Sequence, residues 1–106
     1  LLDAVTALSG SGPAYFYYFV KQMVETGKNM GFDEGTALLL VKQTMLGAYH
    51  LINNAELSLD DLIKAVASKG GTTEAALKVF NDQHLDQSIK EGILAAEQRA
   101  KELSKS

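Results

Sequence analysis

The feature that most constrains this sequence is a run of seven apolar or aromatic residues that directly follows its single proline. Pro13 precedes Ala-Tyr-Phe-Tyr-Tyr-Phe-Val at positions 14–20. At about 100° per residue, such a run covers the whole circumference of a helix rather than one stripe. It is too short to cross a bilayer, which takes about 20 apolar residues. We therefore expect a helix from Pro13 to about Met30. Other protein segments, rather than lipid, should bury this helix on several sides.

The need to bury this helix on several sides has a consequence for the oligomeric state. The chain has 106 residues, of which 46% are hydrophobic, and a net charge of −3, which fits one globular domain. A domain of this size has little interior in which to surround a helix, and the apolar residues 38–41 make a similar demand. We therefore expect an all-α homodimer in which the first helix is buried in an intertwined bundle. A compact monomer with one central helix is the alternative, and the sequence leaves open whether dimers assemble further.

Periodicity predicts about five helices and no strands. The second helix starts with Asp33 as its N-cap and ends near 53–54, and the third follows Ser58, with Asp61 three residues later as in a capping box. The fourth runs from about Thr72 to Asn81. The last begins near Asp86, and the residues on its apolar stripe are Ile89, Ile93, Ala96, Ala100 and Leu103. The Gly-Ser segment 9–12, before the first helix, is expected to be a flexible linker.

Composition argues against several classes of function. Ten basic and thirteen acidic residues are scattered along the chain, so no positive stripe is available for nucleic acid, and no segment suits a membrane. The chain has no cysteine, which excludes disulfides and sulfur-ligated metals and suits the cytoplasm. His50 and His84 lie more than thirty residues apart with no carboxylate at ligand spacing. We expect no metal site, and interpret both as structural or surface histidines.

Polar chemistry is concentrated at one junction, Ser68 to Leu77, where two glycines and two threonines lead into a helix-forming segment. The first backbone N–H groups of a helix have no intrahelical partner, and the helix dipole places about half a positive charge there. Gly70 and Gly71 allow a ligand to approach the backbone, and Thr72 and Thr73 can cap the helix or turn a hydroxyl toward that ligand. The junction predicts an anion site. An ordinary loop with a threonine N-cap is the alternative.

Four blocks of sequence carry a further signal: Ala-Leu-Ser-Gly-Ser-Gly-Pro-Ala-Tyr at 7–15, Met-Gly at 30–31, Gln-Thr-Met-Leu-Gly-Ala at 43–48, and Ser68 to Thr73. Together they resemble pyrroline-5-carboxylate reductase. Their order and spacing agree with the family over essentially the whole chain. The resemblance is to the family's C-terminal helical domain, and it implies a dimerisation and substrate-binding domain spanning 1–106.

The resemblance also implies an activity and a site. Family members reduce 1-pyrroline-5-carboxylate to L-proline with NADPH or NADH, the last step of proline biosynthesis. The substrate carboxylate would rest on residues matching Ser68, Gly70, Gly71, Thr72 and Thr73. The Thr73 hydroxyl would lie near the ring nitrogen and favour the protonated imine. Glu56 is a second catalytic candidate, for stabilising the iminium charge.

Two departures from the family affect this site. The loop at 55–58 lacks the family's acidic-His-Pro pattern, which puts the assignment of Glu56 in doubt. Lys69 stands where the family usually has proline, so the loop loses a fixed φ and gains a cation beside the carboxylate site.

The family's N-terminal Rossmann domain, which binds the cofactor, has no counterpart in this sequence. No strand precedes a G-x-G-x-x-G turn and helix. Because the chain opens on Leu1 rather than methionine, we expect it to be part of a longer enzyme and to be inactive alone. A stand-alone, non-catalytic helical interaction module is the alternative, and a related dehydrogenase with another substrate is a lesser one. The preference between NADPH and NADH would be set in the Rossmann domain.

Overall fold

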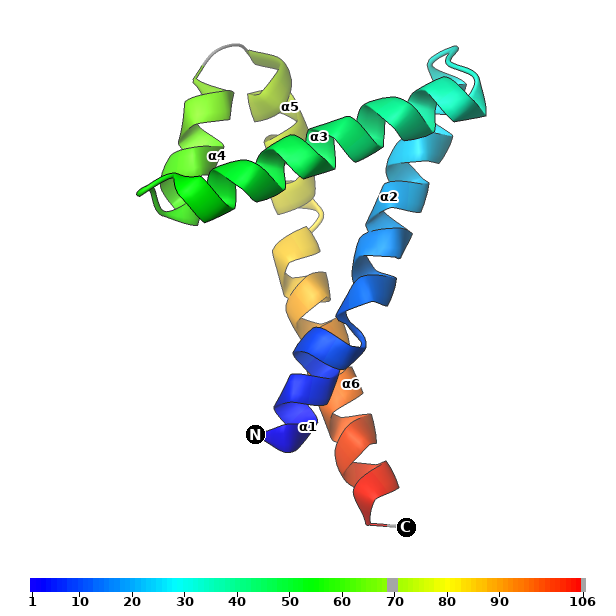
Figure 1. The fold of residues 1–106 in the computed structure, drawn as a ribbon, viewed down its shortest axis with the longest axis vertical. Coiled ribbons are helices and arrows are strands. Elements are labelled where there is room, and N and C mark those ends of the chain that lie inside the picture. Colours follow the sequence, from blue (N-terminus) through cyan, green and yellow to red (C-terminus); the bar gives the residue numbers. More distant parts are fainter. Residues whose placement is uncertain (69–70, 106) are drawn as a thin grey trace. The chain divides into compact units, whose positions relative to one another are not determined.

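The computed structural model describes residues 1–68 and 71–105, and within them every regular element is a helix. The all-α prediction is confirmed, and there are five helices when α1, η1 and α2 are counted as one helical run (Figure 1). In chain order the elements are α1 (Leu2–Val5), the π-helix η1 (Thr6–Gly10), α2 (Gly12–Asn29), α3 (Glu34–Asn54), α4 (Leu59–Ala67), α5 (Gly71–Asp82) and α6 (Leu85–Ser104).

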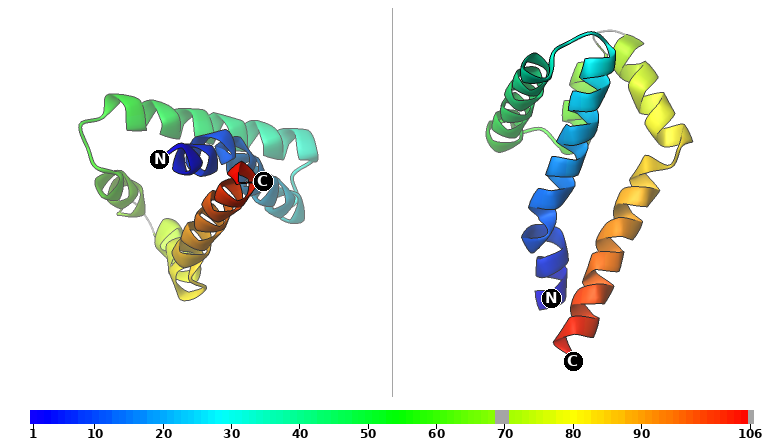
Figure 2. Two further views of the ribbon diagram at one scale, coloured as in Figure 1. Left: turned by 90° about the horizontal axis from the view of Figure 1, so that it is seen from below. Right: turned by 90° about the vertical axis from the view of Figure 1, so that its right-hand side faces the viewer.

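The helices form two compact units, and α2 and α5 each contribute to both. The first unit comprises Leu1–Tyr18 with Leu77–Ser106, and the second comprises Phe19–Ala76. In the first unit, α1 and η1 pack along α6 (Figure 2). The middle of the predicted α6 stripe, Ile93, Ala96 and Ala100, is half-buried, whereas Ile89 and Leu103 at its two ends are exposed.

The prediction of a flexible linker at 9–12 was wrong. Thr6 to Gly10 form a π-helical turn, in which the Ser11 N–H donates to the Thr6 carbonyl at 2.8 Å. Ser11 itself has helical backbone angles, so the helical run extends nearly to Leu1. Glycine and serine permit disorder but do not impose it. Here the packing of η1 on α6 overrides the local preference.

Two predicted helix caps are confirmed. The Asp33 carboxylate accepts hydrogen bonds from the Thr36 N–H at 2.8 Å and from the Thr36 hydroxyl at 3.0 Å. These bonds stabilise the charged carboxylate and lower the pKa of Asp33 below its ordinary value. At the start of α4, the Ser58 hydroxyl accepts from the Asp61 N–H at 3.1 Å. The beginnings of α3 and α4 are therefore fixed by local sequence.

A tight turn joins α2 to α3 in the second unit. Gly31 has a φ of +114°, its N–H donates to the Lys28 carbonyl, and the Phe32 N–H donates to the Gly27 carbonyl. This bond pattern is a Schellman motif, which places glycine in a conformation that side chains disfavour. The motif ends α2 where the sequence predicted, just before Gly31.

Close packing of α2 on α3 depends on Gly27. A Cβ atom built at Gly27 would lie 3.1 Å from the Ala37 Cβ and 3.9 Å from a ring carbon of Phe32. Ala37 is 3% exposed, and Val24, one turn earlier on α2, is 8% exposed. Glycine inside a helix costs up to about 1 kcal/mol relative to alanine. Here it allows α2 and α3 to approach so closely that a Cβ at this position would crowd the Ala37 Cβ.

We therefore expect Gly27→Val to destabilise the protein by about 1–3 kcal/mol, the range for overpacking a well-packed contact. The check is the midpoint of urea unfolding. Gly92→Val is the matched control, because a Cβ at Gly92 in α6 meets nothing within 4 Å. If both variants unfold at the same urea concentration, the close α2–α3 contact does not govern stability.

The apolar first helix is not buried within one chain. Phe16, Tyr17 and Tyr18 on α2 are between 67% and 72% exposed, and Leu39 and Leu40 on α3 are about half exposed. Within the described residues, the buried hydrophobic side chains are Ala7, Val24 and Ala37. These apolar side chains of α2 and of α3 are therefore exposed within their own units.

Candidate functional site

The junction between α4 and α5 is helical almost up to the glycines. α4 ends at Ala67, and Ser68 is its C-cap: the Ser68 N–H donates to the Lys64 carbonyl at 2.9 Å, and its hydroxyl donates to the Ala65 carbonyl at 3.4 Å. α5 begins at Gly71. Lys69 and Gly70 lie outside the described residues, so the predicted roles of both are not addressed by the structure.

Both threonines lie inside the first turn of α5 rather than before it. The helix begins one residue earlier than predicted, which makes Gly71, Thr72 and Thr73 its first three residues. Neither threonine is therefore the N-cap, and the anion site stays a prediction. Thr72 is exposed and Thr73 is half-buried, and neither hydroxyl has a hydrogen-bond partner among the described residues. Both are available to a ligand.

The start of α5 has the chemistry that an anion needs. The N–H groups of the first helical residues point out of the helix, and the positive end of a twelve-residue helix lies there. Thr73, in the first turn, adds a hydroxyl that can both donate and accept a hydrogen bond.

Glu56 is not brought to this junction within one chain. It lies exposed in the loop between α3 and α4, whereas Ser68 follows the last residue of α4. The nine residues of α4 span roughly 13 Å, so Glu56 and Ser68 lie beyond its opposite ends (Figure 1). The role of Glu56 stays a prediction, and it would need a second chain or a rearranged loop.

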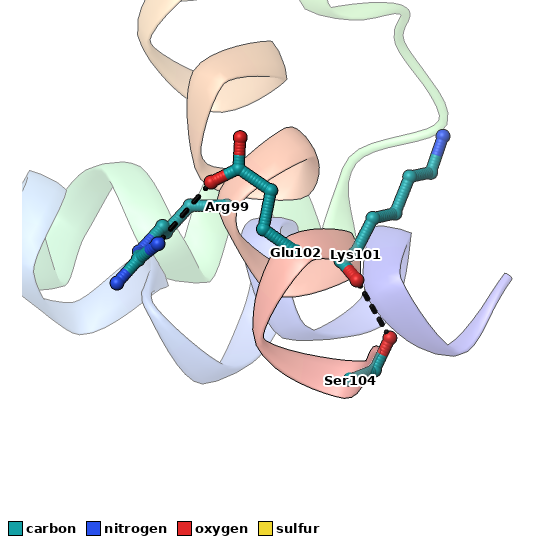
Figure 3. A network of polar contacts seen from close by, with 4 residues as sticks. All are labelled: Arg99, Lys101, Glu102 and Ser104. Carbon is teal, nitrogen blue, oxygen red and sulfur yellow. Dashed lines mark hydrogen bonds and ion pairs between the residues drawn. The ribbon is translucent and has the colours of Figure 1, made fainter. Parts of the chain in front are cut away.

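The remaining polar residues form local contacts. His50 stacks obliquely beside Tyr49, with ring centroids 5.7 Å apart, and His84 joins α5 to α6 with a φ of 57°. Near the C-terminus, Arg99 pairs with Glu102 at 3.2 Å, and the Ser104 hydroxyl donates to the Lys101 carbonyl (Figure 3). The described ranges, 1–68 and 71–105, contain no group of side chains that could hold a metal ion. They also contain no helix with the length and apolarity that crossing a membrane requires.

One polar contact was missed by the sequence interpretation. The Tyr15 hydroxyl donates to the Ala7 carbonyl at 2.6 Å, across the junction of η1 and α2. In the sequence, Tyr15 is one of three tyrosines in an apolar run, and although it ends the family-resembling block 7–15, nothing there predicts this hydrogen bond. The hydrogen bond becomes visible only in the structure, where it accompanies the π-helical turn Thr6–Gly10.

Comparison with known proteins decides the family. Residues 1–103 match the family model described as pyrroline-5-carboxylate reductase dimerisation. The chain belongs to this family. The resemblance seen in the four sequence blocks is thereby confirmed.

Individual relatives agree with the family match. The pyrroline-5-carboxylate reductases of Haemophilus influenzae and Pseudomonas aeruginosa are 45% and 41% identical to the chain over 103 residues. These matches cover 96% and 97% of the chain but 38% of each relative. The chain thus spans little more than a third of the length of these enzymes.

Solved structures share the fold. The pyrroline carboxylate reductase of Plasmodium falciparum, solved with NADP bound, matches with a TM-score of 0.91 and 27% identity, covering 94% of this chain and 38% of that one. The Coxiella burnetii enzyme matches with a TM-score of 0.89 and 40% identity, over 95% of this chain and 37% of that one.

Proposed function

We propose that this chain is the dimerisation and substrate-binding domain, residues 1–106, of an enzyme that reduces 1-pyrroline-5-carboxylate to L-proline in proline biosynthesis. The observation that carries the proposal is the start of α5. There, Gly71, Thr72 and Thr73 present backbone donors and hydroxyls in a chain that belongs to the reductase dimerisation family. The absence of cysteine is compatible with the cytoplasm as its compartment.

The substrate's carboxylate would bind the first N–H groups of α5, with Ser68 and the Gly70–Gly71 pair beside it. In this position the carboxylate would interact favourably with the positive end of the helix dipole. It would also accept hydrogen bonds from the N–H groups that have no carbonyl partner within the helix. The Thr73 hydroxyl would then accept a hydrogen bond from the protonated ring nitrogen. Protonation makes the imine carbon more electrophilic, so a group that favours the iminium form favours hydride addition.

The described residues do not fit a dinucleotide cofactor. Dinucleotide-binding units place a glycine-rich turn between a strand and a helix, whereas Ser9 to Gly12 lie between two helical segments and the described residues include no strand. We propose that NADPH or NADH is held by a Rossmann domain outside this chain. The role of the chain itself is to bind and orient the imino acid.

We further propose a homodimer that buries the apolar faces of α2 and α3 against a second copy. Three aromatic side chains on α2 that are each about two-thirds exposed or more are unusual for an isolated soluble helix. Such side chains suit an obligate interface, since obligate interfaces are more hydrophobic than transient ones and resemble a domain core divided between two chains.

The 106-residue chain alone is expected to be inactive, because hydride transfer needs the nicotinamide positioned over the imine. The measurement is reduction of the imino acid with NADPH or NADH, first with this chain and then with the protein from its complete reading frame. Turnover by the complete protein alone is the expected result. If the complete protein is also inactive while the chain dimerises, the non-catalytic interaction module is the better description.

A further inference from the structure

The π-helical turn leaves one backbone carbonyl without its usual donor. In an α-helix the Ser11 N–H would donate four residues back, to the Ala7 carbonyl. Here it reaches five residues back, to Thr6, at 2.8 Å. Ala7 is 1% exposed, so water has little access to the freed carbonyl. A buried carbonyl without a partner is costly, and this turn therefore needs a second donor.

Tyr15 supplies that donor. Its hydroxyl donates to the Ala7 carbonyl at 2.6 Å, a short hydrogen bond from a half-buried side chain eight residues further along. Pro13 lies between the two residues and has no N–H of its own to offer. Tyr17 and Tyr18 are exposed on the same helix, and their hydroxyls bond to nothing among the described residues. Among these three tyrosines, Tyr15 is thus distinguished by its hydrogen bond to the Ala7 carbonyl.

The hydrogen-bond register of this turn, π-helical or α-helical, decides which side chains of η1 and α1 face α6. If the Ser11 N–H returned to Ala7, the segment before it would rotate by about 100° relative to α2. α1 and η1 pack on α6, so this rotation would change the face that meets α6. Ala7, small and buried, has the larger and exposed Leu8 as its neighbour. The α-helical register would exchange a small side chain for a large one in a packed contact.

We propose that Tyr15 is a register lock: its hydroxyl holds the Thr6–Gly10 segment in the π-helical form by satisfying the carbonyl that this form frees. The lock sets the rotation of the N-terminal segment on α6. It involves residues of the first unit and none of the residues proposed to bind the substrate.

The direct test is a crystal structure of Tyr15→Phe in the complete protein. Phenylalanine keeps the ring and removes the donor. We expect the Ser11 N–H to move from the Thr6 carbonyl to the Ala7 carbonyl, with a rotation of residues 1–7 of about 100°. Tyr17→Phe is the matched control and should keep the π-helical turn. A Tyr15→Phe structure that retains the Ser11–Thr6 bond overturns the proposal.

A second measurement needs no variant and decides the question if Tyr15→Phe does not fold. Tyrosine labelled with ¹³C at Cζ is incorporated into the unaltered protein, and spectra are recorded in an equal mixture of H₂O and D₂O. A slowly exchanging hydroxyl gives two Cζ signals, one for each hydrogen isotope. We expect two signals for Tyr15, because its hydroxyl donates to the Ala7 carbonyl. A single averaged signal for Tyr15 contradicts the lock.

Discussion

Phe16→Glu in the complete protein is expected to convert a tight dimer into monomer or aggregate. Phe16 is 67% exposed within one chain, and we propose that a second copy covers it. The substitution would place a carboxylate in that interface with no cation to pair with it, and an unpaired buried ion costs several kcal/mol. Light scattering after size-exclusion chromatography, at micromolar protein, measures the change in mass.

Gln22→Glu is the control for Phe16→Glu. It adds the same charge to the same helix, at an exposed position that is already polar, and should leave the dimer intact. Phe19→Glu, at a second aromatic position of α2, should reproduce the effect of Phe16→Glu. An unaltered protein that is a stable, folded monomer under these conditions would mean that the apolar surface of α2 has some other cover.

Where short-range chemistry decides the structure, the sequence was sufficient to predict it. Asp33 and Ser58 cap the helices that follow them because a side-chain oxygen three residues before an unpaired N–H is favourable in almost any context. Gly31 ends α2 because a left-handed residue is needed there. These features depend on four or five consecutive residues, so they can be read without knowing the fold.

The features that the sequence missed depend on contacts between distant residues. The Gly-Ser segment at 9–12 was predicted to be a linker, but the packing of η1 on α6 and the bond from Tyr15 to Ala7 make it helical. Nothing in the local sequence shows that Gly27 lies close to Ala37 on the next helix. No local pattern contains either contact.

The candidate site could be predicted in part for the same reason. The junction before α5 is local, and glycines followed by threonines and a helix-forming segment led to the hypothesis of an anion site, which stays a prediction. Glu56 was proposed from the family resemblance, and the length of α4 separates it from Ser68 within one chain. The burial of Thr73 relative to Thr72 was also invisible in the sequence, and it gives the two hydroxyls different surroundings.

Thr73→Val in the complete enzyme is expected to lower kcat by roughly tenfold to a hundredfold with a smaller change in KM. Valine keeps the β-branched shape and leaves the backbone N–H groups of α5 in place to hold the carboxylate. What is lost is one hydrogen bond to a charged group, worth about 1.5–3 kcal/mol. Because we assign the hydroxyl to the ring nitrogen, where charge changes during hydride addition, the loss should fall on the transition state.

Thr72→Val separates this role from simple anchoring. Thr72 is the preceding residue of the same turn, and the substitution is chemically identical, but its exposed hydroxyl is assigned only to carboxylate binding. Its effect should therefore appear chiefly in KM, as for an interaction made equally in the bound substrate and in the transition state. Steady-state kinetics on both variants decide between the roles. Equal losses confined to KM in both variants would make Thr73 a second carboxylate anchor. The proton on the ring nitrogen would then need another partner, and Glu56 of a second chain is the remaining candidate.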